Sequence, residues 1–235
     1  MKEHPRFIVT CGGTAGHINP AIAIANAIKA NCPGAEILFV GTEDGRENDL
    51  VSRAGYRIVH VNVMGIQRSL TLSNVKALCL AATSPIKAEK MLRDWRADFV
   101  IGTGGYACWP MLKAASKLGI PCAVHESNVV PGMAVRKLQK KVDRIYTNFP
   151  ETTDKLLPEV GTKIKRVGNP LLDGFLTTDR EEARRTLGID DKAFMVLSFG
   201  GSLGAEKIND AVTEFISSIY LSLNSNPLPE VSNQL

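Results

Sequence analysis

The chain has 235 residues, 44% of them hydrophobic and 22% charged, which excludes global disorder and suits one large or two small globular domains. The net charge of +4 is too mild for a nucleic-acid coat but suits contact with anionic lipid or phosphorylated substrates. Five cysteines without a Cys-x-x-Cys pair argue against a disulfide framework or a zinc site and favour a reducing cytoplasm.

Short apolar runs alternate along most of the chain with amphipathic segments of helical length. This alternation predicts βαβ units, and hence an α/β fold with a Rossmann-like parallel sheet covered on both faces. The runs predicted as strands are Phe7–Thr10, Glu36–Val40, Ile58–Val61, Phe99–Ile101, Pro121–Val124, Arg144–Thr147 and Ile164–Val167.

The first helix carries start and stop signals. Asn19 is a suitable N-cap, Pro20 fits a first turn, and Pro33 with Gly34 predicts the end of the helix. The segment before Phe7 is too short for a signal peptide, and no apolar run is long enough to span a bilayer. We therefore expect any membrane contact to be peripheral.

A second unit begins after Gly168. A helix is predicted over Arg180–Leu187, a strand over Phe194–Ser198, and a further helix from about Ala205, after a glycine loop. The helical pattern fades after about residue 217, and the polar end of the chain is typical of a loop.

The domain prediction follows from the lengths of these two parts. A doubly wound domain needs roughly 100–150 residues. We therefore predict a complete domain over 1–167 and an incomplete second Rossmann-like domain over 168–235.

The first strand leads into a glycine-rich loop that ends at His17. Glycines let the backbone approach a ligand closely, and the start of a helix offers free N–H groups, so the loop could hold a phosphate or a sugar phosphate. A tight βα turn without a ligand explains the glycines equally well. Cys11 stands where the dinucleotide fingerprint needs glycine, which weakens an NAD interpretation, and we expect no cofactor.

Two more polar turns follow later strands, Gly102–Tyr106 and His125–Asn128. Polar side chains are costly as filler in a buried crevice but useful around a sugar, although each turn could also be a plain hydrophilic loop. Because the carboxyl ends of parallel strands share one edge of a sheet, the three turns should converge there.

A stretch between Met64 and Arg93 mixes apolar and basic residues. Such a patch could lie on an anionic membrane surface. From the pattern alone, a core helix with a solvated basic face is the better explanation.

Taken together, the motifs resemble the MurG family of bacterial cell-wall glycosyltransferases, over residues 6 to 212. The motifs occur in the family's order and spacing: Gly12-Gly-Thr-Ala-Gly-His17 with Pro20, Gly102-Thr-Gly-Gly-Tyr106, His125-Glu-Ser-Asn128, Val167-Gly-Asn-Pro170 and Gly200-Gly-Ser-Leu-Gly-Ala205. The resemblance implies a GT-B fold with two Rossmann-like domains and a cleft between them.

The resemblance also implies an activity, inverting transfer of N-acetylglucosamine from UDP-GlcNAc to lipid I. The acceptor is undecaprenyl-linked, the product is lipid II for peptidoglycan synthesis, and the site is the cytoplasmic face of the bacterial cell membrane. In this family the first domain handles the lipid acceptor, which favours membrane contact for the Met64–Arg93 stretch, and the second domain holds most of the UDP.

Site residues are carried over from matching motif positions. Residues implied to contact the donor are Thr14, Ala15, Gly16, Asn128 and Ser202, and other residues implied in the cleft are Gly104, Gly105, Tyr106 and His125. His17 is the first choice for the general base, because its unperturbed pKa lies near neutrality, and Glu126 is the second. No Asp-x-Asp triplet offers ligands for a metal clamp, so no metal is expected.

Two departures from the family pattern affect donor binding. Leu172 and Leu203 stand where the family often has Arg and Gln, and the later donor-binding segment has no counterpart before Leu235. The alternative reading is therefore an acceptor- or membrane-binding half that needs another chain for the donor. A nucleotide-dependent oxidoreductase and a transferase acting on diacylglycerol are further alternatives.

Overall fold

The computed structural model describes residues 3–63, 72–201 and 205–225. The chain divides into two compact units, Met1–Thr178 and Asp179–Leu235. The first unit contains a seven-stranded sheet, and the second consists of helices and extended chain in its described part.

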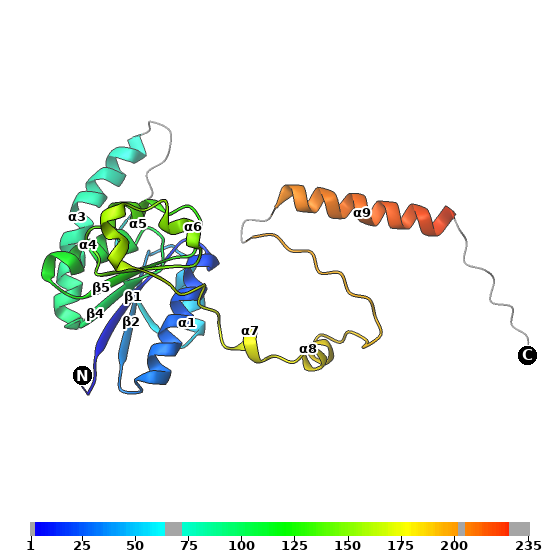
Figure 1. Ribbon diagram of the computed structural model, residues 1–235, viewed down its shortest axis with the longest axis horizontal. Helices are drawn as coiled ribbons and strands as arrows, with labels where there is room; N and C mark the ends of the chain where they lie inside the picture. Colours follow the sequence, from blue (N-terminus) through cyan, green and yellow to red (C-terminus); the bar gives the residue numbers. More distant parts are fainter. Residues whose placement is uncertain (1–2, 64–71, 202–204, 226–235) are drawn as a thin grey trace, which may run out of the picture. The chain divides into compact units, whose positions relative to one another are not determined.

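All seven predicted strands of the first unit form, and every neighbouring pair is parallel (Figure 1). The order across the sheet is β3-β2-β1-β4-β5-β6-β7. Their bounds are β1 Arg6–Thr10, β2 Glu36–Gly41, β3 Arg57–His60, β4 Phe99–Gly102, β5 Cys122–Glu126, β6 Arg144–Thr147 and β7 Ile164–Arg166.

Helices cover both faces of this sheet. In Figure 1, α1 lies on one side and α3 and α4 lie on the other. The bounds in the first unit are α1 Ala15–Asn31, α2 Glu47–Arg53, α3 Leu72–Trp95, α4 Cys108–Leu118, α5 Met133–Leu138, α6 Pro150–Thr153, the 3-10 helix η1 Pro158–Lys163, and α7 Gly174–Thr177. No helix in the described part of the chain is long and apolar enough to cross a bilayer.

The central strands are apolar on both faces because both faces are buried. Ile8 of β1 packs into the core under α3 and α4, and its neighbour Val9 packs into the core under α1. Successive strand residues point to opposite faces, so such a strand appears in sequence as a continuous apolar run. The apolar runs of the sequence therefore predict these strands correctly.

The start of α1 differs from the prediction. The helix begins at Ala15 with Thr14 as its N-cap, and Asn19 and Pro20 lie inside it. Proline lacks the N–H that an interior helical residue donates, and a Pro after Asn resembled a helix start for that reason. The predicted stop holds, since the helix ends at Asn31, directly before Cys32 and Pro33.

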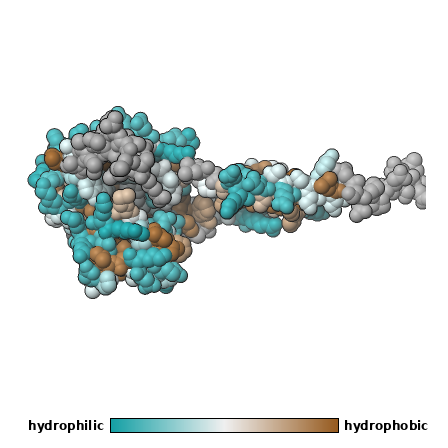
Figure 2. Space-filling model, turned by 90° about the horizontal axis from the view of Figure 1, so that it is seen from above, coloured by the Kyte–Doolittle hydropathy of each residue, from teal (hydrophilic) through white to brown (hydrophobic). Residues whose placement is uncertain are grey.

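The second unit contains α8 (Arg180–Thr186) and α9 (Glu206–Ser225), both near their predicted positions. Helix α9 continues to Ser225, eight residues past residue 217, near which the helical pattern in the sequence fades. The predicted strand Phe194–Ser198 is wrong for this structure, because the segment is not paired with any described strand and Phe194 is 93% exposed. Apolar and polar side chains are both exposed along α9 (Figure 2).

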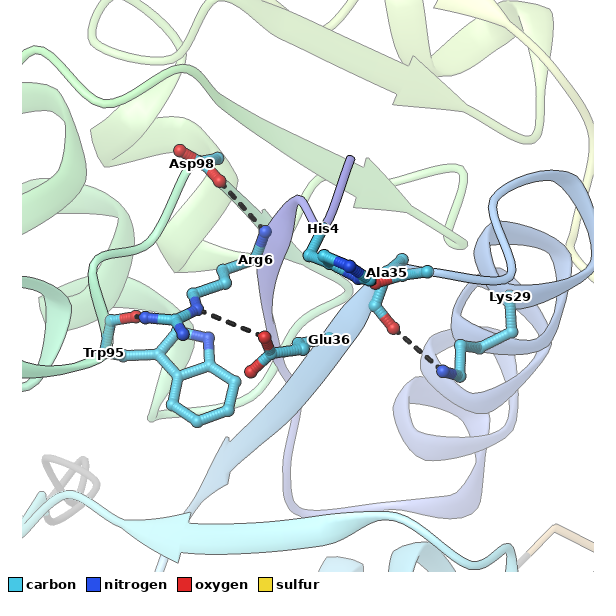
Figure 3. A network of polar contacts seen from close by, with 8 residues as sticks. His4, Arg6, Lys29, Ala35, Glu36, Trp95 and Asp98 are labelled. Atoms are coloured by element: carbon cyan, nitrogen blue, oxygen red, sulfur yellow. Dashed lines mark hydrogen bonds and ion pairs between the residues drawn. The ribbon is translucent and has the colours of Figure 1, made fainter. Parts of the chain in front are cut away.

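At the amino-terminal edge of the sheet, one polar network ties three strands together (Figure 3). The Arg6 N–H donates to Asp98 Oδ2 at 3.0 Å, which joins the starts of β1 and β4. The Arg6 guanidinium reaches Glu36 Oε1 of β2 at 3.4 Å and lies 5.8 Å from the centre of the Trp95 ring. This network lies at the opposite end of the strands from the glycine turns.

Asp98→Ala should lower the free energy of unfolding by about 1–2 kcal/mol, because it leaves the Arg6 N–H without its carboxylate. Urea unfolding followed by tryptophan fluorescence measures this change in the first unit alone, since both tryptophans, Trp95 and Trp109, belong to it. Asp94→Ala is the matched control: Asp94 is an exposed partner of Lys90 and should matter little. Equal effects of the two variants would contradict the role of Asp98.

Candidate active site

The carboxyl edge of the sheet has a reversal point in its strand order. β1 and β4 are direct neighbours, yet β2 and β5 continue the sheet in opposite directions from them. Open α/β sheets bind ligands in the crevice at such a point. Three of the predicted turns follow β1, β4 and β5, so they meet at this edge.

A cavity of about 380 Å³ lies at this edge. It contains seven of the predicted site residues, namely Thr14, His17, Gly104, Gly105, Tyr106, Glu126 and Asn128. Val63, Trp109, Met133 and Val135 add apolar wall, and Lys137 adds a positive charge. Polar groups and apolar surface together fit a ligand with a sugar or phosphate part and an apolar part.

The remaining predicted site residues do not line this cavity. Ala15 and Gly16 lie in the first turn of α1, outside the lining. His125 lines a different and largely apolar cavity of about 360 Å³. Ser202 and Leu203 lie outside the described residues, as do residues 64–71 of the Met64–Arg93 stretch. The rest of that stretch belongs to helix α3, whose Ala88 and Leu92 are buried in the core.

His17 is held by the glycine loop itself. Its Nδ1 lies 3.1 Å from the Gly12 carbonyl oxygen. A carbonyl oxygen can only accept, so Nδ1 carries a proton, and in the Nδ1–H tautomer of a neutral imidazole Nε2 keeps its lone pair. The hydrogen bond of the ring to a described residue is made through Nδ1, which leaves Nε2 able to take a proton from a ligand in the cavity.

The two glycine turns are in direct contact. A Cβ on Gly105 would collide with the Gly12 carbonyl, and a Cβ on Gly104 would lie 2.5 Å from His17 Cδ2. Both residues also have positive φ, +121° for Gly104 and +90° for Gly105. Glycine is therefore needed at both positions for His17 to sit beside the second turn.

Cys108 holds the backbone of the Gly102–Tyr106 turn through hydrogen bonds. Its thiol lies 2.9 Å from the Gly104 carbonyl oxygen and accepts the Gly104 N–H at 3.2 Å. Burial raises the pKa of Cys108 to about 12, so it remains a neutral thiol at physiological pH and can donate. Its role here is to hold the backbone.

Glu126 uses its carboxylate to shape the third turn. Oε1 accepts the backbone N–H and the side-chain amide of Asn128, both at 2.9 Å, and Oε2 accepts the Gly132 N–H at 2.7 Å. These donors fix the carboxylate at the wall of the cavity. The contacts favour a role in positioning Asn128 over a role as the base.

His125 points to the other face of β5. It is 1% exposed, and its Nε2 donates to the Gly168 carbonyl at 2.9 Å. Burial lowers the pKa of His125 below 6.5, which keeps the ring neutral. The residue therefore ties the sheet to the Gly168–Pro170 segment.

One buried group beside the site was missed by the sequence analysis. Glu47, at the start of α2, is 0% exposed and accepts the Gly13 N–H of the first glycine loop at 3.2 Å. A signal was present: glycines at positions 41 and 45 closely precede this carboxylate. Two glycines within six residues before one carboxylate indicate that the backbone packs against it.

The doubly wound sheet and its crevice define a Rossmann-like α/β protein with a ligand site at the strand reversal. The model of the glycosyltransferase family 28 N-terminal domain matches residues 7–147, and the chain belongs to this family.

Similar proteins include transferases named UDP-N-acetylglucosamine--N-acetylmuramyl-(pentapeptide) pyrophosphoryl-undecaprenol N-acetylglucosamine transferase. Those of Alkaliphilus oremlandii and Acetivibrio thermocellus are each 43% identical over 90% of this chain. The chain spans 57% of the length of both relatives.

Solved structures agree on the fold. The crystal structure of Acinetobacter baumannii MurG matches with a TM-score of 0.66 at 24% identity, over 91% of this chain and 57% of that one. UDP-GlcNAc 2-epimerase from Neisseria meningitidis matches with a TM-score of 0.58 at 17% identity, over 92% of this chain and 62% of that one. The first similarity confirms the predicted GT-B architecture.

Gly105→Ala should destabilise the first unit more than Gly119→Ala. Both residues have positive φ, but a Cβ on Gly119 meets nothing within 4 Å, whereas one on Gly105 meets the Gly12 backbone. Backbone strain alone costs about 1–2 kcal/mol, and the collision adds about 1–3 kcal/mol. Urea unfolding of both variants measures the difference, and equal losses would show that the two turns do not touch.

His125 should make the first unit less stable in acid. Its folded-state pKa lies below the ordinary 6.5, so as pH falls through that value the unfolded chain binds a proton that the folded chain does not. Stability is therefore lost below pH 6.5. The melting temperature should fall between about pH 7.5 and about pH 5.5, and it should fall less in His125→Gln, whose amide still donates to Gly168, than in the wild type. An equal fall in both proteins would show that His125 is not the source of the acid sensitivity.

Proposed function

We propose that this chain provides the acceptor side of a glycosyltransferase that moves N-acetylglucosamine from UDP-GlcNAc to lipid I. Membership of family 28 and relatives that carry this activity in their names support the proposal. The observation that carries it is the His17 ring, which lines the cavity at the strand reversal and makes its hydrogen bond to a described residue through Nδ1.

The proposed reaction is an inverting displacement at the anomeric carbon. The C4 hydroxyl oxygen of the acceptor sugar forms the new bond to C1, and His17 Nε2 takes the hydroxyl proton. The bond from C1 to the donor diphosphate breaks, and UDP leaves with the electron pair. Asn128, fixed by Glu126, lies in the same cavity and offers its carbonyl oxygen to a sugar hydroxyl.

The domain roles follow from the same proposal. Residues 1–167 would form the acceptor and membrane-side domain, and residues 168–235 would begin the domain that binds UDP-GlcNAc. The helices of the second unit and its exposed apolar segment support this assignment, because such a segment suits a central strand of a larger sheet. The rest of such a domain would correspond to the part of the relative's length that this chain does not span.

Membrane contact is proposed at α5 and the residues just before it, on the cytoplasmic face of the bacterial membrane. Val130 is 54% exposed and Met133 60% exposed, and the basic residues Arg136 and Lys137 follow them on α5. Apolar side chains beside cations suit an anionic lipid surface. A lipid-linked acceptor could then enter the cavity from the membrane.

The test is a transfer assay with labelled UDP-GlcNAc and a lipid I analogue in anionic vesicles. The chain is assayed alone, and then as a chimera completed with the remaining carboxy-terminal segment of the Alkaliphilus relative. Labelled lipid from the chimera supports the proposal. A chimera that folds and binds UDP-GlcNAc but transfers no sugar would overturn it.

In whichever of these two proteins transfers sugar, the chain alone or the chimera, His17→Ala should lower kcat at least about tenfold, because the proton acceptor is lost. His60→Ala is the control, since His60 is exposed and bonds to Asn48 away from the cavity. Initial rates at saturating donor measure both variants. Full activity in His17→Ala would remove His17 from the role of base.

A further inference from the structure

Glu47 is a buried carboxylate with no part in the mechanism above. Its Oε1 accepts the Thr42 N–H and the Thr42 hydroxyl, both at 2.7 Å. Its Oε2 accepts the Gly13 N–H at 3.2 Å. The carboxylate thus joins the end of β2 to the first glycine loop.

The backbone is shaped to hold this group. A Cβ on Gly12 would lie 2.9 Å from Glu47 Oε1, and one on Gly41 would lie 2.5 Å from Glu47 Cγ. A Cβ on Gly45 would collide with the carboxylate itself. Three glycines from two segments of chain therefore approach Glu47 at places where any larger residue would displace it.

The contact with Gly13 leads directly to His17. The Gly13 N–H and the Gly12 carbonyl belong to the same peptide group. One side of that planar group donates to Glu47 Oε2, and the other side accepts the Nδ1–H of His17. Hydrogen bonds in such a chain polarise one another, so a carboxylate at the N–H makes the carbonyl a better acceptor.

We propose that Glu47 is a positioning residue that acts on His17 through the Gly12–Gly13 peptide. It holds the peptide in place, strengthens the bond to Nδ1–H, and so keeps the Nε2 lone pair available to the cavity. In a carboxylate–histidine pair the carboxylate accepts the Nδ1–H directly and so fixes the tautomer. Here the carboxylate acts in the same way through one intervening peptide group. The use of Nε2 as a base rests on the proposed function, but the control of the tautomer does not.

The same contact restricts the first glycine loop. The Gly13 N–H already has an internal anion as its acceptor. A phosphate oxygen placed there would have to displace Glu47, and it would meet a like charge at short range. A phosphate group bound in this cavity should therefore contact groups other than the Gly13 N–H.

The test reads the tautomer of His17 in the 235-residue chain by long-range proton–nitrogen NMR with labelled histidine. Four histidines give four ring spectra, and His17→Gln identifies the signal of His17. The wild type should show the Nδ1–H form. Glu47→Gln keeps the shape of the side chain but removes its charge, so the Nε2–H form should appear as a second population.

Asp49→Asn is the matched control, because Asp49 is an exposed carboxylate on the same helix, paired with Arg53. It should leave the His17 spectrum unchanged. An unchanged His17 spectrum in folded Glu47→Gln would overturn the proposal. A shift of equal size in Asp49→Asn would also overturn it, since the effect would then be only the loss of a charge on α2.

A second measurement needs no variant. Gly13 lies outside any helix or strand, and its N–H is held by Glu47. Hydrogen exchange of the wild-type chain should show protection at the Gly13 amide, and free exchange there would overturn the proposal even if Glu47→Gln failed to fold.

Kinetics in the completed chimera separate this proposal from the proposed function. Glu47→Gln should lower kcat about tenfold with KM for the donor unchanged, because Glu47 does not line the cavity. A raised KM with unchanged kcat would count against a role through His17. If the wild-type chimera transfers no sugar, the proposed function fails, and the NMR result still decides the role of Glu47.

Discussion

The site is organised around the close contact of two backbone turns at the strand reversal. Parallel pairing of β1 with β4 brings the Gly12 peptide against Gly105, with no side chain between them. Thr103 adds a bond across the same junction, from its hydroxyl to the His17 carbonyl at 2.7 Å. The position of α1, and with it the His17 ring, therefore depends first on main-chain packing, to which the Thr103 and Glu47 side chains add hydrogen bonds.

Backbone groups also hold the other polar residues of this edge. Glu126 is fixed by N–H groups of its own turn, and His125 is fixed by the Gly168 carbonyl. Backbone partners change little when side chains are substituted, so the arrangement tolerates variation around it. It is sensitive instead to changes in loop length or in the glycines that permit these approaches.

Much of the fold was predictable because its physical signals are local. Buried parallel strands appear as apolar runs, and all seven in the first unit were found. The segment Phe194–Ser198 has the same signal but no described neighbour to pair with, and a strand requires a partner that local sequence cannot supply. The start of α1 was misplaced because Pro20 resembles a first-turn residue.

The site was predictable to the level of which turns meet, but not to the level of where each side chain points. His125 and Glu126 are adjacent in the sequence, yet strand alternation sends them to different cavities. Glu47 was missed because its significance depends on the contact of Gly12, which is distant in the sequence, as well as of Gly41 and Gly45. The combined glycine turns also carried the family resemblance, which the family match confirms.

The exposed apolar segment of the second unit has a consequence for handling the protein. Phe194, Val196, Leu197 and Phe199 are each more than 60% exposed, in an extended stretch without proline or charge. Exposed stretches of this kind pair between molecules as β-strands and nucleate aggregates. Solutions of the 235-residue chain will therefore self-associate with rising concentration, whereas a fragment ending at Thr178 keeps the whole cavity and omits the aggregating stretch.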